Sequence, residues 1–375
     1  MADAPVAVIG GGVVGAAVAY TLARKGVPSV LLETEADFGL AASGTNSGIV
    51  HTGFDSVPGE LETQMILRAG ELRDPVLEEL DVPIHRCGAV LRANDEAEIE
   101  TVKALAANAG RNGVDVSFDG EALHVPGESI TDPVAYTTGL IAAASIRGVD
   151  ARPRSRVERI ARIDDGLALA IAGGAEVTCR VAVNCAGLYA DEVARLAGDD
   201  SFSIYPRKGE FFVFEPPEPL DQILLPVPTK RTKGVLVFPT IDGHVIAGPT
   251  AHDQDDKEDW TVRPSAYVEV IEKARAMWPA LENAEPIASY AGLRTAGRDG
   301  VNYMIGPAVG CPELINVAAI RSTGLTASLG IGEYVAELVA AQGIELGETD
   351  TEVTGLTWTS MPWWRRTAQA KAVTM

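Results

Sequence analysis

The chain has 375 residues, of which 46% are hydrophobic and 22% are charged, the balance of a folded globular protein with more than one domain. Its formal net charge is −21, from 52 acidic and 31 basic residues. A surface of this charge repels a phosphate backbone, which argues against nucleic acid as a partner. A small anionic substrate remains compatible with it, because such a substrate needs only a few local cations.

The cysteine pattern and the start of the chain indicate the compartment. The four cysteines contain no C-x-x-C pair, so we predict free thiols and no metal site or iron–sulfur cluster. Met1 is followed directly by an apolar segment, without the basic region of a signal peptide. No apolar run approaches the roughly 20 residues of a membrane span. We therefore expect a cytoplasmic protein.

The first 33 residues predict a strand–helix–strand unit. Residues 6–9 are apolar and read as a buried parallel strand. The glycine-rich residues 10–15 follow, and a helix extends from there to Arg24. Lys25 and Gly26 are typical of a helix end, and residues 30–33 form the second strand.

The glycines of this unit predict a dinucleotide site. Gly10, Gly12 and Gly15 form a G-x-G-x-x-G pattern between strand and helix, and Glu33 ends the second strand. The glycines permit a tight turn, a close approach to pyrophosphate and close helix–strand packing, while the acid accepts hydrogen bonds from ribose hydroxyls. The alternative is a glycine-rich turn that binds nothing.

Downstream, the hydrophobic spacing predicts further elements. The expected helices cover residues 61–80, 95–115, 133–147, 266–281 and 324–340. The expected strands include 88–91, 157–160, 167–171, 176–183, 211–214, 234–238, 244–247 and 314–320. The three strands within 157–183 resemble a β-meander. Residues 204–250 are predicted to form an antiparallel sheet, and residues 251–259 a polar, acidic loop.

Two further segments favour FAD as the dinucleotide. Residues 41–48 and 321–326 are rich in Gly, Ser and Thr, and the second of them opens a helix. Two helix starts at opposite ends of the chain suit one extended cofactor, with pyrophosphate at the first and the flavin ring at the second. No second G-x-G-x-x-G occurs, which argues against a separate NAD(P)H site.

At this point the residues resemble a known family. The matching segments are 46–55, 184–191, 206–210, 237–240, 248–251, 291–294 and 322–328. The chain resembles the FAD-dependent oxidoreductases of the D-amino-acid oxidase and glycerol-3-phosphate dehydrogenase superfamily. Within it, the likeness is greatest to the group of glycerol-3-phosphate dehydrogenases and oxidases and L-2-hydroxyglutarate oxidases.

The resemblance implies an α/β fold in which a Rossmann-type FAD-binding domain is interleaved with a substrate domain built on a mixed, mainly antiparallel sheet. We assign residues 1–80, 150–200 and 288–350 to the FAD domain, 81–149 and 201–287 to the substrate domain, and 351–375 to a C-terminal tail. The residues assigned to the cofactor are Gly10, Gly12, Val13, Val14, Gly15, Glu33, Ser43, Gly44, Thr45, Asn46, Ser47, Gly48, Val157, Ala186, Gly187, Gly324, Leu325 and Thr326.

Three residues are candidates for the chemistry. The resemblance places His51 beside the flavin, where a neutral imidazole takes a hydroxyl proton as hydride leaves. Its alternative role is packing or hydrogen bonding beside the flavin. Arg294 follows a Gly-Leu pair at a strand end, and its guanidinium suits a carboxylate or phosphate. A structural ion pair is the alternative for Arg294, and Arg321 is a candidate second anion contact.

The implied activity is oxidation of the hydroxyl of a small anionic substrate, such as glycerol 3-phosphate or L-2-hydroxyglutarate, to the ketone. Oxygen, a quinone or a carrier protein would accept the electrons. The alternatives are an amine or amino-acid oxidase of the same fold and a flavoprotein without turnover. In the tail, Trp358, Trp363 and Trp364 with Arg365 and Arg366 suggest either weak membrane contact or docking on the protein's own domain or a partner subunit.

Overall fold

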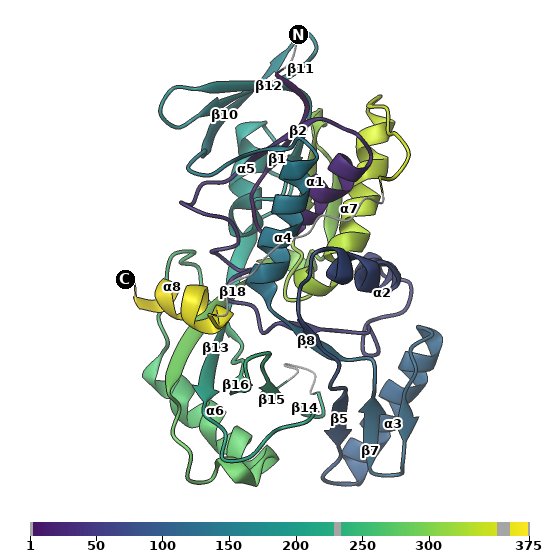
Figure 1. Cartoon of the computed structure of the whole chain (residues 1–375), viewed down its shortest axis with the longest axis vertical. Helices are drawn as coiled ribbons and strands as arrows, with labels where there is room; N and C mark the ends of the chain where they lie inside the picture. Colours follow the sequence, from purple (N-terminus) through teal and green to yellow (C-terminus); the bar gives the residue numbers. More distant parts are fainter. Residues whose placement is uncertain (1–2, 229–233, 351–360, 374–375) are drawn as a thin grey trace.

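The computed structural model describes residues 3–228, 234–350 and 361–373, and it places one large sheet in each half of an elongated molecule (Figure 1). The sheet of the upper half consists of β1 (Ala4–Ile9), β2 (Ser29–Leu32), β9 (Asp150–Arg152), β10 (Val157–Ile163), β11 (Gly166–Ile171), β12 (Glu176–Asn184), β19 (Met304–Ala308) and β20 (Cys311–Ala318). Strands β9, β2, β1, β12 and β20 are parallel, whereas β10, β11 and β12 form the predicted antiparallel meander.

The parallel register fixes where a ligand can bind. Ile9 pairs with both Leu32 and Asn184, and Asn184 pairs with Asn316, so four strands end at one edge of the sheet. The Asn184 side-chain amide donates to the Asn316 side-chain oxygen at 2.8 Å in the buried interior and ties two of these strand ends together. Ligands of open parallel sheets bind at this carboxyl edge.

Helices cover one face of the upper sheet. They are α1 (Val13–Arg24), α2 (Leu61–Glu79), α4 (Pro133–Ile146) and α7 (Gly324–Ala341), while the short α5 (Ala190–Leu196) lies on β20 and β10. Helix α7 packs between α1 and α2, and α4 packs on α1. The predicted helix stop is confirmed, because Lys25 caps α1 and Gly26 has a φ of +68°.

The sheet of the lower half is mainly antiparallel. Its strands are β5 (Ala89–Arg92), β6 (Ser117–Phe118), β7 (Ala122–Val125), β13 (Ile204–Phe214), β14 (Ile223–Leu225), β15 (Leu236–Pro239), β16 (Val245–Gly248), β17 (His252–Asp253) and β18 (Ala288–Gly297). Among the pairs of this sheet within the described residues, only β5–β14 is parallel. The mixed, mainly antiparallel substrate domain is therefore confirmed.

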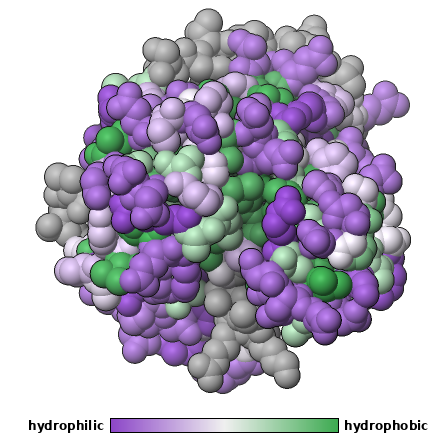
Figure 2. Space-filling model, turned by 90° about the horizontal axis from the view of Figure 1, so that it is seen from below, coloured by the Kyte–Doolittle hydropathy of each residue, from purple (hydrophilic) through white to green (hydrophobic). Residues whose placement is uncertain are grey.

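Two helices and a small sheet complete the lower half. Helix α3 (Glu96–Arg111) begins at Asp95, whose carboxylate accepts a hydrogen bond from the Glu98 N–H at 2.8 Å, and α6 (Pro264–Met277) packs on β13, β15 and β16. Strands β3 (Ile49–Val50), β4 (Ile84–His85) and β8 (Ser129–Thr131) form the small sheet. Seen from the lower end, apolar residues gather at the middle of the face and hydrophilic residues surround them (Figure 2).

The predicted domain boundaries place two elements in the wrong half of the molecule. Helix α4 was assigned to the substrate domain but packs on α1, because its small residues Gly139, Ala143 and Ala144 allow a close approach. Strand β18 was assigned to the FAD domain but pairs with β13 along its whole length. The remaining boundaries stay a prediction.

Candidate cofactor and active site

Two glycines bring β1, α1 and the end of β12 into close contact. Gly10 has a φ of +110°, and a Cβ atom there would lie 2.4 Å from the carbonyl oxygen of Cys185. A Cβ atom on Gly15 would lie 1.9 Å from the carbonyl oxygen of Gly10. A larger side chain at either position would separate the helix from the sheet, so these positions require glycine.

The N-terminus of α1 is suited to an anion. Gly12 precedes the helix without a side-chain cap, and the first turn contains no acidic residue. The Val13 N–H donates to Ser43 Oγ at 2.9 Å, which draws the 39–46 loop to the helix start. Free N–H groups and the positive end of the helix dipole attract phosphate, so this position fits the pyrophosphate of a dinucleotide.

Glu33 lies beside this helix start. Its Oε2 atom accepts from the Gly11 N–H at 2.6 Å and its Oε1 atom accepts from the Glu35 N–H at 2.8 Å. Burial raises the pKa of Glu33, and the hydrogen bonds from the Glu35 and Gly11 N–H groups oppose that rise. The carboxylate is thus fixed by the backbone and directed toward the position where a ribose would lie.

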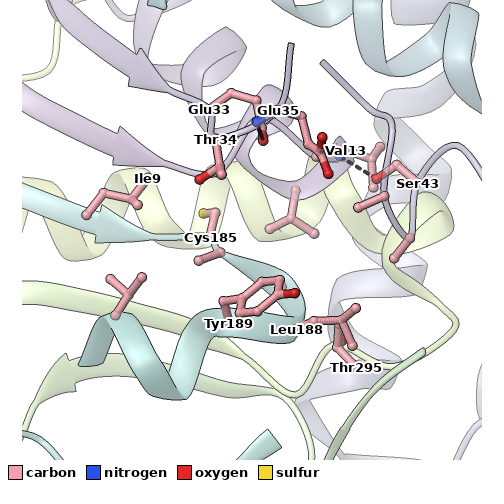
Figure 3. A pocket seen from close by; sticks show the side chains of 18 of the residues that line it. Ile9, Val13, Glu33, Thr34, Glu35, Ser43, Cys185, Leu188, Tyr189 and Thr295 are labelled. Carbon is pink, nitrogen blue, oxygen red and sulfur yellow. Dashed lines mark hydrogen bonds between the residues drawn. The ribbon is translucent and has the colours of Figure 1, made fainter. Parts of the chain in front are cut away.

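A cavity of about 640 Å³ runs along the carboxyl edge of the sheet. Figure 3 shows Glu33, Thr34 and Glu35 on one side of this cavity and Leu188 and Tyr189 across from them. The volume lies within the usual range of sites for small molecules and cofactors. Twelve of the predicted cofactor residues line it: Gly10, Gly12, Val13, Val14, Glu33, Ser43, Asn46, Val157, Ala186, Gly187, Gly324 and Leu325.

The other six predicted cofactor residues lie outside this lining. They are Gly15, Gly44, Thr45, Ser47, Gly48 and Thr326. The structure gives them supporting contacts: the Gly44 carbonyl accepts from Thr367 Oγ1 at 2.8 Å, and Thr326 Oγ1 accepts from the His51 N–H at 3.1 Å. Direct contact of these six with the cofactor stays a prediction.

The N-terminus of α7 reaches the same cavity from the other end of the chain. Gly324 and Leu325 line the cavity, and the first turn of α7 carries neither an acidic residue nor a side-chain cap. Glu62 holds this segment, because its carboxylate accepts from Thr323 Oγ1 at 2.8 Å and from Arg321 Nη2 at 2.6 Å. The positive end of α7 therefore faces the cavity. This agrees with the prediction that the flavin ring lies at the start of this helix.

Arg321 differs from its prediction in one respect. It lines the cavity, but its guanidinium forms an ion pair with Glu62, so its charge is already compensated. Burial raises the pKa of Glu62, but the hydrogen bond from Asn302 and the charge of Arg321 outweigh it and lower the pKa. The backbone of Arg321 bridges to Thr295, which follows Arg294.

His51 lies just after β3 and close to the start of α7. Its backbone N–H donates to Thr326, and its ring Nδ1 atom lies 2.8 Å from Glu128 Oε2. The side chain is about a quarter exposed (23%), whereas that of Glu128 is fully buried (0%). The ring is therefore held from its Nδ1 side, and His51 itself does not line the cavity.

Arg294 lies on β18 beside the cavity-lining Thr295. Its Nη2 atom donates to the Thr250 carbonyl at 2.6 Å, and no carboxylate within the described residues forms an ion pair with it. Burial and the neighbouring Arg207 lower the pKa of Arg294 to about 10, while Asp253 opposes them. A guanidinium without a counterion in this environment fits an anion-binding role.

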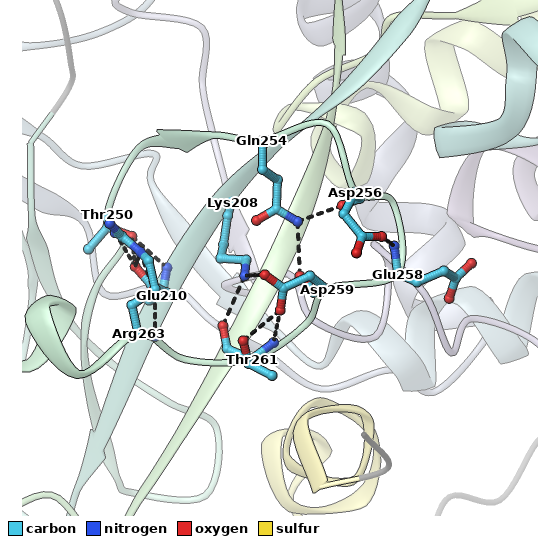
Figure 4. A network of polar contacts seen from close by, with 9 residues as sticks. All are labelled: Lys208, Glu210, Thr250, Gln254, Asp256, Glu258, Asp259, Thr261 and Arg263. Carbon is cyan, nitrogen blue, oxygen red and sulfur yellow. Dashed lines mark hydrogen bonds and ion pairs between the residues drawn. The ribbon is translucent and has the colours of Figure 1, made fainter.

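Two ion pairs from β13, each with one fully buried member, fasten the loop of residues 254–263. Lys208, which is fully buried, donates to Asp259 Oδ2 at 2.8 Å, and the buried Glu210 pairs with Arg263 at 2.6 Å (Figure 4). Both side chains point from the strand toward this loop (Figure 4). The loop carries Glu258 and Trp260, which line the cavity, so these pairs fix one wall of it.

The end of the chain docks on the protein itself. Residues Trp364–Ala368 form a π-helical turn and α8 (Gln369–Val373) follows. Trp363 and Trp364 are both 1% exposed, and Trp363 packs edge-on against Tyr290 of β18. The docking alternative is therefore confirmed for these two side chains, while Trp358 lies outside the described residues. Of the helices in the described part of the chain, none combines the length and apolar composition that a bilayer crossing needs.

Sequence reasoning missed three contributors to the site. Glu128 is 77 residues from His51 in the chain, and no local pattern marks it as a partner. Lys371 and Trp260 also line the cavity, although the sequence places them in the C-terminal tail and the substrate domain. The docked tail brings Lys371 there, and its Nζ atom pairs with Glu35 at 2.8 Å. The aromatic and basic composition of the tail was the one available signal.

Comparison with known proteins agrees with this site. The family model "FAD dependent oxidoreductase" matches residues 5–338. A glycerol 3-phosphate dehydrogenase of Caloramator mitchellensis is 30% identical over 89% of this chain and 73% of its own length. An L-2-hydroxyglutarate dehydrogenase of Escherichia coli is 25% identical over 71% of this chain and 68% of its own length.

A solved structure shares the fold over nearly the whole chain. The dithionite-reduced L-alpha-glycerophosphate oxidase of Mycoplasma pneumoniae, with FAD bound, superposes with a TM-score of 0.86 at 26% identity. The match covers 95% of this chain and 99% of that one. The glycine cradle, two helix starts without acidic residues in their first turns and the cavity that both line fit an extended FAD molecule. The chain therefore belongs to the family of FAD-dependent oxidoreductases.

Proposed function

We propose that this protein oxidises the hydroxyl of a small anionic substrate, of the glycerol 3-phosphate or 2-hydroxy acid class, to the ketone. The observation that carries the proposal is the position of His51, which is held through Nδ1 and joined to the first turn of α7 at the cofactor cavity. The names of the relatives, a glycerol 3-phosphate dehydrogenase and an L-2-hydroxyglutarate dehydrogenase, support the substrate class.

The reaction divides between cofactor and protein. FAD, when bound, accepts the hydride that leaves the carbon bearing the hydroxyl. His51 takes the hydroxyl proton on Nε2, the ring atom opposite the one facing Glu128, and the C–O bond becomes the carbonyl. Two electrons and two hydrogens thus leave the substrate, one hydrogen as hydride and one as a proton. A hydroxyl substrate needs a proton acceptor, whereas an amine substrate can lose hydride without a base. A base at this position therefore favours a hydroxyl substrate.

Arg294 binds the anionic group of the substrate in this proposal. Its guanidinium has no carboxylate partner among the described residues and lies next to Thr295 of the cavity wall. A phosphate or carboxylate would supply the missing counterion through two parallel hydrogen bonds. The compartment we propose is the cytoplasm, and the four free thiols support it, because such thiols persist in reducing surroundings.

The test is reduction of the bound flavin under anaerobic conditions, which does not depend on the electron acceptor. Glycerol 3-phosphate, L-2-hydroxyglutarate and a set of amino acids are added separately, and loss of the visible flavin absorbance is followed. We expect bleaching by a hydroxy substrate in the wild type. His51→Ala should retain FAD and reduce the flavin roughly 10²–10⁴-fold more slowly.

Two outcomes would overturn the proposal. Bleaching by amino acids alone would assign the protein to the amine-oxidising branch of the fold. An unchanged rate of flavin reduction in His51→Ala would remove the histidine from the chemistry. His124→Ala is a suitable control, because His124 is partly exposed, pairs with Asp119 and does not line the cavity, and this variant should reduce its flavin at the wild-type rate.

A further inference from the structure

Glu128 is a fully buried carboxylate with a fixed position. It lies between β7 and β8, where its backbone N–H donates to Val125 and its carbonyl accepts from the Gly88 N–H at 2.9 Å. A Cβ atom on the preceding Gly127 would lie 2.7 Å from Thr52 Cγ2, so this turn is packed closely against the segment that carries His51. Such a carboxylate needs a function or a partner, because burying a charge is costly.

All the hydrogen bonds of the Glu128 side chain go to His51 and Thr52. Oε1 accepts from the Thr52 N–H at 2.7 Å and from Thr52 Oγ1 at 3.0 Å, while Oε2 lies 2.8 Å from His51 Nδ1. A backbone N–H can only donate, so Oε1 is an acceptor. An ionised carboxylate can only accept, so opposite Glu128 in that form His51 carries its ring proton on Nδ1.

Arg73 supplies a positive charge that interacts with the carboxylate. Its Nη2 atom is buried and makes no hydrogen bond. Burial lowers the pKa of Arg73, and the charges of Tyr136 and Glu128 are among those that oppose the shift. Arg73 and Glu128 thus attract each other without a direct hydrogen bond.

We propose that Glu128 is the positioning residue of the reaction: it fixes His51 in the tautomer with the proton on Nδ1, so that the Nε2 lone pair is free to accept the hydroxyl proton. The inference rests on the proposed role of His51 as the base. Glu128 touches neither the cavity nor the space beyond Nε2, so it acts only through the imidazole. Carboxylates orient catalytic and metal-binding histidines in the same way.

The substitution Glu128→Gln tests this arrangement without changing its shape. The Thr52 N–H still needs an acceptor, so the amide oxygen of the glutamine turns toward Thr52 and its NH₂ group faces His51 Nδ1. Nδ1 must then accept, which moves the ring proton to Nε2 and removes the lone pair that the substrate needs. We expect kcat for flavin reduction to fall by a factor on the order of 10² or more, with KM and bound FAD little changed.

A second measurement reads the tautomer without turnover. In the FAD-loaded protein labelled with ¹⁵N-histidine, the ring nitrogen shifts of His51, assigned by their loss in His51→Asn, should show Nδ1–H in the wild type and Nε2–H in Glu128→Gln. Glu79→Gln is the matched control: Glu79 is also buried, but it is bonded to Tyr20 and Arg147 within the FAD half. This control should leave kcat and the His51 signals unchanged.

The two proposals fail differently. If His51→Ala reduces its flavin at the wild-type rate, the base itself is wrong and the proposed function falls. If His51→Ala is inactive but Glu128→Gln keeps both the wild-type kcat and the Nδ1–H signal, only the role of Glu128 is overturned. A Glu128→Gln protein that loses kcat with an unchanged tautomer also contradicts the proposal, because the loss would then come from packing.

Discussion

At the scale of single residues, Arg294 shows a conflict between stability and binding. Its guanidinium is held in a buried setting that lowers its pKa to about 10, and it has no carboxylate partner in the described part of the chain. An uncompensated buried charge costs folding free energy, and the cost is recovered only when an anion binds. Residues that destabilise the free protein in this way are common where a charged ligand must be recognised.

The substitution Arg294→Met tests this conflict. We expect the substrate-free variant to melt at a temperature no lower than the wild type, because the uncompensated charge is gone. Substrate at about 100 times its Kd should stabilise the wild type by about 2.7 kcal/mol, and the same concentration should stabilise the variant far less. Thermal melting with and without glycerol 3-phosphate or L-2-hydroxyglutarate measures both effects.

The control for this experiment is Arg298→Met. Arg298 lies just after β18, the strand that carries Arg294, and it pairs with the exposed Asp255. It should retain the full substrate-induced shift. Equal shifts in the wild type and in Arg294→Met would show that the anion binds elsewhere.

The residues of the cofactor cradle were predictable because they are local. Gly10, Gly15 and Glu33 belong to one strand–helix–strand unit, in which spacing alone fixes their geometry. The partners of the catalytic candidates were not predictable, since Glu128 and Glu62 reach His51 and Arg321 from segments far away in the chain. A sequence pattern carries no information on which distant carboxylate a given cation or imidazole meets.

At the scale of elements, the C-terminal segment contributes to the wall of the cavity that fits FAD. Thr367 donates to the Gly44 carbonyl, Arg366 pairs with Asp132 at 3.1 Å, and Lys371 pairs with Glu35 and lines the cavity. Figure 1 shows α8 beside β13 and β18, next to the boundary between the two halves. The segment thus fastens the FAD half to the substrate half.

Reversing the charge of Lys371 should weaken FAD binding. Lys371→Glu places a carboxylate beside Glu35 and opposite a cofactor with two phosphates, and we expect the Kd for FAD to rise about tenfold. Fluorescence titration of the deflavinated protein with FAD measures this change. Lys273→Glu serves as the comparison, since Lys273 lies on the outer face of α6 and pairs with Glu269. If both variants bind FAD as the wild type does, the segment has no role in holding the cofactor.

The long helices and several four-residue strands were predicted correctly, whereas strands of two or three residues were not. Helices α1, α2, α6 and α7 and the meander follow the expected residues closely, because apolar residues occupy most of their buried positions. Strands β3, β4 and β8 contain two or three residues, which is too few for any period to be visible. Helix α8 and the turn before it have no amphipathic signature and form against partners that the sequence does not identify.

At the scale of the whole molecule, buried ion pairs set its response to acid. Burial raises the pKa of Asp259, but the hydrogen bonds from Lys208 and Thr261 outweigh this and lower the pKa to about 2. Burial likewise raises the pKa of Glu210, and the bonds from Arg263 and Thr250 outweigh it and lower the pKa. A carboxyl whose pKa is depressed in the folded state stabilises above its ordinary pKa, and that stabilisation is lost as the pH falls through the lowered value.

We therefore expect the free energy of unfolding to fall between pH 3.8, the ordinary pKa of an aspartate, and about pH 2. Lys208→Met removes the partner of Asp259, so the variant should be less stable at pH 6 and lose less stability across this acidic interval. Urea unfolding at several pH values measures the two slopes. Lys103→Met is the control, because it removes only an exposed pair with Glu100, and it should follow the wild-type curve. Parallel curves for Lys208→Met and the wild type would contradict the role of the Lys208–Asp259 pair.

The interleaving of the two halves has a consequence for synthesis. Strand β12 is complete at Asn184, but its parallel neighbour β20 begins only at Cys311, after most of the other half has been made. On the ribosome, the nascent chain therefore presents the Val- and Ala-rich edge of β12 without its partner during a long interval. Such an open edge attracts other chains, so early protection by a chaperone should raise the yield of the flavoprotein more than it would for a protein whose domains follow one another.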